Sequence, residues 1–269
     1  MILRCVCWSI FLCLVLGPAV EAQVTVDDQG YQNVLISFAP SIPYAKGKET
    51  VEKIRNLLER TSNILHKAIG IPIASATFLL PPSWSTETWT DIKVTPASPE
   101  QTARRSDIRL DGTEDSPFIN QPVALQHGGC GVPGHQIILN LNSIGGVLKY
   151  PEDKLIAREW LKYRYGVFEE NGFFYDPLYP TYYRVPGNPE IRITDCTNSK
   201  ITYVFKEPII FDACDMNLVG RFGFCRAHPD EKSAANVTSS LMYFHTDLPN
   251  VSMPNWPIQT LEDDTEYCI

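Results

Sequence analysis

Three features are scarce in this chain of 269 residues, and each scarcity excludes a class of protein. Only five histidines occur, and no two stand four residues apart, so the paired metal ligands of a zinc-protease helix are missing. No block of lysine and arginine appears and the net charge is -8, which argues against binding to nucleic acid. Beyond the N-terminus, no apolar run approaches the roughly 18 residues that a membrane span requires.

The N-terminus predicts a secretory signal peptide over residues 1–22. Arg4 supplies the basic start, residues 10–16 form a short apolar core, and residues 20–22 fit a small-residue cleavage site. Because this apolar core is too short to cross a membrane, we expect a secreted, extracellular protein that begins at Gln23. The alternative is an uncleaved membrane anchor.

Eight cysteines occur, of which three fall in the predicted signal peptide. Four of the others could form two disulfides in an oxidising compartment, namely Cys130, Cys196, Cys214 and Cys225. Cys268 is left over, and it is either free, paired with another chain, or without its partner in a truncated product. Two N-x-S/T sequons agree with secretion and make Asn236 and Asn250 candidate glycosylation sites.

Hydrophobic periodicity predicts an α+β fold. A strand over residues 33–38, an amphipathic helix over 48–69 and a strand over 73–80 predict one crossover and a parallel pair. The remaining chain predicts strands at 106–110 and 136–141, a helix at 149–165, a loop over 171–190, a hairpin within 191–211 and an irregular end after Leu248.

The second predicted helix carries the most informative stretch, residues 157–170. Zinc proteases place histidines at positions i and i+4 of one helix, with a glutamate general base at i+1. Here Glu159 is at the general-base position, whereas Arg158 and Lys162 are at the ligand positions and offer zinc no lone pair. Gly166 and Glu169 then follow at the spacing of a sharp turn and a third ligand. An ordinary amphipathic helix would explain residues 158–162 alone but not this continuation.

One other local cluster of metal-capable groups, His127, Cys130 and His135, lies in a glycine-rich loop. In a secreted protein Cys130 is more simply a disulfide partner than a metal ligand. Met242 is interpreted as a core residue, and the alternative is the floor methionine that lies below a metzincin site.

Residues 159–170 resemble the signature of the calcium-activated chloride channel regulators (CLCA proteins), His-Glu-Trp-x-His-x-Arg-Trp-Gly-Val-Phe-Asp-Glu. The resemblance also includes residues 30–36, 78–84, 130–131 and 240–244, and it covers about residues 24–250. It implies that residues 23–250 form the family's N-terminal domain and that 251–269 form an irregular, acidic tail. The implied fold is a zincin-like metallopeptidase domain with a mixed sheet, a long backing helix, an active-site-type helix and stabilising disulfides.

The resemblance also implies roles for four residues. The family's two histidine ligands correspond to Arg158 and Lys162, its third, acidic ligand to Glu169, and its general base to Glu159. Since one ligand of three cannot hold a catalytic zinc, we expect no cofactor, although zinc is bound by family relatives. We expect Arg158 and Lys162 to pair with Glu159 or Glu169 in place of the metal; the alternative is that both side chains extend into solvent.

Three functions are compatible with these residues. The first is a catalytically inactive domain that binds an extracellular or membrane protein, such as a chloride channel or a full-length relative, and modulates calcium-activated chloride conductance. The second is an active extracellular zinc metallopeptidase with atypical ligands, such as His127, His135 or a carboxylate. The third is a truncated fragment of a full-length CLCA protein.

Overall fold

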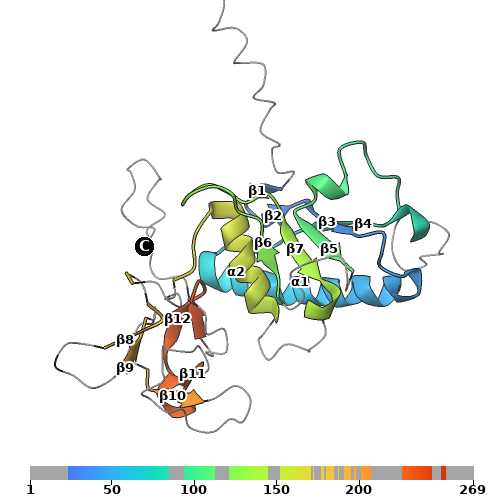
Figure 1. Cartoon of the computed structure of the whole chain (residues 1–269). Coiled ribbons are helices and arrows are strands. Elements are labelled where there is room, and N and C mark those ends of the chain that lie inside the picture. Colours follow the sequence, from blue (N-terminus) through green and yellow to red (C-terminus); the bar gives the residue numbers. More distant parts are fainter. Residues whose placement is uncertain are drawn as a thin grey trace, which may run out of the picture.

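The computed structural model centres on one mixed β-sheet with two helices packed against it (Figure 1). It describes residues 24–84, 94–112, 121–144, 152–170, 172, 177–178, 180–184, 187, 191–194, 197, 201–206, 226–243 and 250–252. The predicted signal peptide and almost all of the predicted tail therefore lie outside the described residues.

The sheet has five strands in the order β4-β3-β5-β7-β6. Its four parallel strands are β3 (Val34–Phe38), β4 (Ala76–Leu79), β5 (Ile108–Asp111) and β7 (Ile137–Asn140). The short strand β6 (Val123–Ala124) is antiparallel to β7 and forms one edge. Every residue of β3 and β7 is buried, as expected for inner strands that are covered on both faces.

Helix α1 (Gly47–Ile69) places a stripe of apolar side chains toward the core, including Val51, Ile54 and Leu58. It ends at Gly70, whose φ of 75° lets its N–H reach the carbonyl of His66. Helix α2 (Glu152–Tyr165) packs against α1 and also contacts β6 and β7. The main core therefore lies between the sheet and these two helices, and its largest side chains are those of Trp84 and Trp160.

Short elements make up the rest of the described chain. Strands β1 (Thr25–Asp27) and β2 (Gly30–Gln32) form an antiparallel pair, as do β8 (Tyr182–Arg184) with β9 (Ile191–Ile193) and β10 (Tyr203–Lys206) with β11 (Arg226–Pro229). Strands β12 (Thr238–Ser240) and β13 (Asn250–Ser252) are parallel, and α3 spans Glu231–Ala234. Single 3-10 turns occupy Tyr44–Lys46, Pro82–Trp84, Ala103–Arg105 and Leu141–Ser143. Ile201, Val237 and Tyr243 belong to a second, smaller core.

The structure confirms the predicted mixed α+β architecture through residue 165, including the long helix and the parallel β3–β4 pair. Two predictions in the C-terminal part are wrong. Among the described residues of 191–211, the expected hairpin is not seen, because β9 pairs with β8 and β10 pairs with β11. The loop expected over 171–190 contains β8. Alternating hydrophobicity locates a strand but does not determine its partner, which explains both errors. Strand β13 also lies at the start of the end region that was expected to be irregular.

Candidate functional site

Helix α2 is buried far beyond the usual single stripe of an amphipathic helix. Residues 155–161 are all buried, and they include the side chains of Arg158 and Glu159. The side chain of Arg158 is 5% exposed and that of Glu159 is 2% exposed. Because burying an unpaired charge is very costly, both groups require partners inside the protein.

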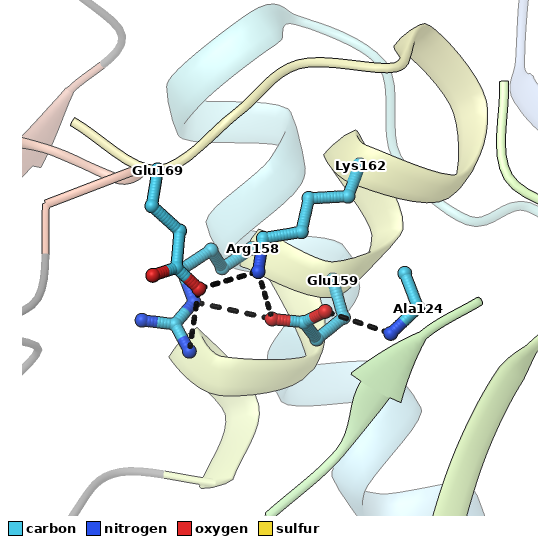
Figure 2. A network of polar contacts seen from close by, with 5 residues as sticks. All are labelled: Ala124, Arg158, Glu159, Lys162 and Glu169. Atoms are coloured by element: carbon cyan, nitrogen blue, oxygen red, sulfur yellow. Dashed lines mark hydrogen bonds and ion pairs between the residues drawn. The ribbon is translucent and has the colours of Figure 1, made fainter. Parts of the chain in front are cut away.

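Those partners form a charge cluster of four residues, Arg158, Glu159, Lys162 and Glu169 (Figure 2). Lys162 Nζ lies 2.9 Å from Glu159 Oε1 and 2.5 Å from Glu169 Oε1, so it bridges the two carboxylates. Arg158 Nε lies 3.3 Å from Glu159 Oε1, and Arg158 Nη2 lies 3.8 Å from Glu169 Oε1. Arg158 and Lys162 were expected to pair with Glu159 or Glu169, and each of them contacts both carboxylates.

The second oxygen of Glu159 is also occupied. Its Oε2 accepts a hydrogen bond from the backbone N–H of Ala124, at 2.8 Å. Ala124 belongs to the edge strand β6, and the neighbouring Leu125 donates its own N–H to the carbonyl of Gln136, the residue directly before β7. Glu159 therefore joins α2 to the edge strand β6 (Figure 2).

A glycine turn returns the chain from the end of α2 to the charge cluster. Gly166 has a φ of 64°, and its N–H donates to the carbonyl of Lys162 at 2.9 Å. Its carbonyl accepts from Gly131 at 3.1 Å, and a Cβ added at Gly166 would collide with the backbone of Val132. The turn brings Glu169 back to within reach of Lys162, as the spacing in the sequence predicts.

A second buried network lies at Tyr163 of the same helix. The Tyr163 hydroxyl donates to Asp107 Oδ1 at 2.5 Å, and the N–H of Leu35 donates to Asp107 Oδ2 at 2.7 Å. Burial raises the pKa of Asp107, although these hydrogen bonds oppose the rise. Burial and the nearby Asp107 carboxylate also raise the pKa of Tyr163. This network fastens α2 to β3 and to the residue that precedes β5.

Residues 24–249 match one protein family, described as calcium-activated chloride channel N terminal (CLCA). The chain belongs to the CLCA family. The match confirms the resemblance to this family and covers nearly all of the expected range, residues 24–250.

The CLCA domain has similar stretches in longer curated proteins. Calcium-activated chloride channel regulator 2 of Homo sapiens is 24% identical over 240 residues, and that of Mus musculus is 27% identical over 241 residues. These alignments cover 85% and 86% of this chain but only 23% of each relative. Calcium-activated chloride channel regulator 1 of Mus musculus is 24% identical over 226 residues, which are 75% of this chain and 24% of the relative. The chain thus spans about a quarter of the length of these relatives. No solved structure matches it.

Two histidines of the glycine-rich loop lie together in this CLCA domain. The rings of His127 and His135 have their centres 5.2 Å apart, and both residues are exposed. Cys130 is disulfide-bonded, so it cannot supply a thiolate to a metal. Among the described residues, no group of three or more His, Cys, Asp or Glu side chains could hold a metal ion.

Met242 lies in the main core and is 3% exposed, which confirms its interpretation as a core residue. Its carbonyl accepts the N–H of Glu170 at 3.0 Å, so it supports the segment that follows the Gly166 turn. Asn236 is exposed and Asn250 begins β13, and glycosylation at both remains a prediction. The other cysteines predicted to form disulfides, Cys196, Cys214 and Cys225, lie outside the described residues, as does Cys268.

Sequence reasoning missed three participants around α2. Ala124 acts through its backbone N–H, and no side-chain motif marks such a donor. Asp107 and Tyr163 are 56 residues apart in sequence and meet only in the folded chain. The one available signal was a carboxylate inside the predicted strand 106–110, at Asp107.

Within the described residues, no helix has the length and apolar character that a bilayer crossing demands.

Proposed function

We propose that this CLCA domain is a secreted, catalytically inactive, zincin-like domain that acts by binding a protein partner. The observation that carries the proposal is the charge cluster, because its two cationic side chains stand at the positions that the resemblance assigns to two histidine ligands. Lys162 Nζ contacts Glu159 and Glu169 together, so a fixed ammonium lies between the two carboxylates where a dication would otherwise be needed.

Metal binding at this place is opposed by both charge and ligand chemistry. The guanidinium of Arg158 and the ammonium of Lys162 offer no lone pair, and their positive charge repels a metal cation. Glu169 is the one residue at a ligand position that could still coordinate, whereas a catalytic zinc takes three protein ligands. These contacts favour a domain without a catalytic zinc.

General-base chemistry at Glu159 is opposed by the way its two oxygens are used. Oε1 accepts from Lys162 and Arg158, Oε2 accepts from Ala124, and the side chain is 2% exposed. A general base must come within hydrogen-bond reach of the proton that it removes, directly or through one water. Glu159 therefore serves as a structural acceptor in this proposal.

Peptide binding along the nearby sheet edge is opposed by the same contact. An extended peptide can add to a sheet edge only by pairing with free backbone groups. The N–H of Ala124 on edge strand β6 is donated to Glu159, so this N–H is not free for a substrate strand. The space that a peptidase would use beside α2 is thus crossed by a hydrogen bond of the protein itself.

The binding role follows from this loss of chemistry together with the family. The relatives carry the name of calcium-activated chloride channel regulators. An extracellular or membrane protein, either a chloride channel or a full-length relative, is therefore our proposed partner, and modulation of calcium-activated chloride conductance is the proposed outcome. The zincin-like fold and disulfides among the predicted cysteines belong to the same proposal.

The test compares the mature protein with the Arg158→His/Lys162→His variant. We expect no zinc to remain at α2 in the wild type after gel filtration with a mild chelator. We expect the variant to retain about one zinc per chain, because two imidazoles then join Glu169 in a three-ligand set. A third protein that also carries Glu169→Ala is the control and should lose this retained zinc.

Metal content is measured by atomic emission, and peptidase activity by a self-cleavage gel and a peptide library. One zinc per wild-type chain, removable only by a strong chelator, would contradict the proposal. So would peptide cleavage by the wild type that disappears in Glu159→Gln.

A further inference from the structure

The glycine-rich loop presents two exposed imidazoles side by side. His127 and His135 have their ring centres 5.2 Å apart, with 43° between the ring planes. Both residues are exposed. This arrangement is separate from the charge cluster and plays no part in the function proposed above.

The separation of the rings fits a shared metal ion. Two imidazoles bound to one tetrahedral zinc at about 2.0 Å from nitrogen to metal hold their ring centres roughly 5 Å apart. The observed 5.2 Å therefore needs little movement beyond rotation of each ring about its own bond to Cβ. Two exposed rings are free to make that rotation.

The backbone that carries the two histidines is held in place from several sides. At its base, Leu125 donates to Gln136 and accepts from the N–H of His135, each at 2.8 Å. Further along, Gly134 donates to the carbonyl of Tyr163 at 2.9 Å and Gly131 donates to that of Gly166 at 3.1 Å. The two imidazoles are therefore displayed by a loop that is anchored to the end of α2, which lowers the entropy cost of binding one ion.

We propose that His127 and His135 form a surface site for a divalent transition-metal ion. Imidazole nitrogen suits zinc, copper and nickel, and it does not suit magnesium or calcium, which prefer oxygen. Two imidazoles fill two positions of the ion, and in this proposal water or another donor fills the others. Such a site is weaker than a structural zinc site and resembles neither a Cys-rich nor a three-histidine centre.

The experiment is a calorimetric titration of the mature protein with nickel and with zinc, near neutral pH. We expect one equivalent to bind, and we expect His127→Asn or His135→Asn to weaken binding by roughly tenfold or more. His66→Asn is the matched control, because His66 is also exposed but lies near the end of α1. That control should bind as the wild type does.

Two results would overturn the site. One is the absence of binding at millimolar metal, which would leave the two rings as an aromatic contact only. The other is unchanged affinity in the His127→Asn/His135→Asn double variant, which would place the ion elsewhere in the chain. Neither result affects the proposal for α2. That proposal is tested by a different measurement, the zinc that the Arg158→His/Lys162→His variant keeps in the presence of a chelator. Magnesium, tested in parallel, should give no heat in any variant.

Discussion

Helix α2 holds buried carboxylates in two ways, and the contrast explains why the charge cluster needs its cations. At Tyr163, the single carboxylate Asp107 is stabilised by two neutral donors, the Tyr163 hydroxyl and the N–H of Leu35. At the charge cluster, Glu159 and Glu169 share the bridging Lys162 and are also contacted by Arg158. The described hydrogen bonds to Asp107 thus come from neutral groups, although the nearby positive charge of Arg164 also acts to lower its pKa.

The difference lies in the number of carboxylates that meet. Their contacts with one Lys162 Nζ place an oxygen of Glu159 and an oxygen of Glu169 within about 5 Å of each other, where two negative charges repel by roughly 3 kcal/mol. Asp107 has no such carboxylate among its described contacts. The two cations thus offset this repulsion between the two carboxylates, and this is the comparison that the following variants probe.

The largest effect is expected when both cations are replaced by apolar side chains of similar length. In Arg158→Met/Lys162→Met, Glu159 stays buried without a positive partner beside Glu169. Removing the partners of a buried charge destabilises proteins by about 3–5 kcal/mol. The free energy of unfolding, measured by urea denaturation with circular dichroism, should fall by an amount in that range.

A matched variant separates charge from packing in this experiment. Adding Glu159→Gln and Glu169→Gln to the double methionine variant removes the repulsion at nearly constant volume. Much of the lost stability should return, because neutral amides carry no buried charge. Equal losses in the double and quadruple variants would mean that packing, and not repulsion, explains the cost.

The same contrast explains what the sequence could predict. The charge cluster was predictable because Arg158, Glu159 and Lys162 lie within about one turn of the same helix. The glycine at position 166 also predicts a turn that brings Glu169 back toward them. The first strands and both long helices were predictable from local periodicity. Asp107 and Tyr163 were not, since their contact depends on the packing of α2 against the sheet. The partners of β9 and β10 were missed for the same reason, because pairing between strands is a tertiary choice.

A smaller effect is expected at Asp107, and its size should depend on pH. In Asp107→Asn, one of the two carboxylate oxygens that accept hydrogen bonds is replaced by an amide nitrogen, so one buried donor loses its acceptor. An unsatisfied buried donor costs about 1–3 kcal/mol. Because burial raises the pKa of Asp107, the folded state binds its proton more tightly than the unfolded state, whose pKa is near 3.8. The stability that this proton gives is complete below the unfolded pKa and is lost as the pH rises through the folded pKa.

The penalty of Asp107→Asn should therefore be larger at about pH 4.5 than at neutral pH. Unfolding free energies of the wild type and the variant at both pH values provide the measurement. Asp28→Asn is the control, because Asp28 is exposed and should show little penalty at either pH. If the loss of unfolding free energy in Asp107→Asn grew toward neutral pH, the raised pKa of Asp107 would be contradicted. Asp107 would then behave as a carboxylate that is stabilised in its charged form.

The smallest effect is expected at Tyr163. Tyr163→Phe removes the hydroxyl that donates to Asp107 Oδ1 and keeps the ring, so the loss should be about 1 kcal/mol, typical of one hydrogen bond. Tyr183→Phe, in which the half-exposed ring of β8 loses the same atom, should change stability by less. In the Asp107→Asn background Tyr163→Phe should cost less than in the wild type, because its acceptor has changed. If the losses of the two single variants simply add in the double variant, Tyr163 and Asp107 do not act as one unit. The charge cluster and the Asp107 network would then differ only in the charges that they contain.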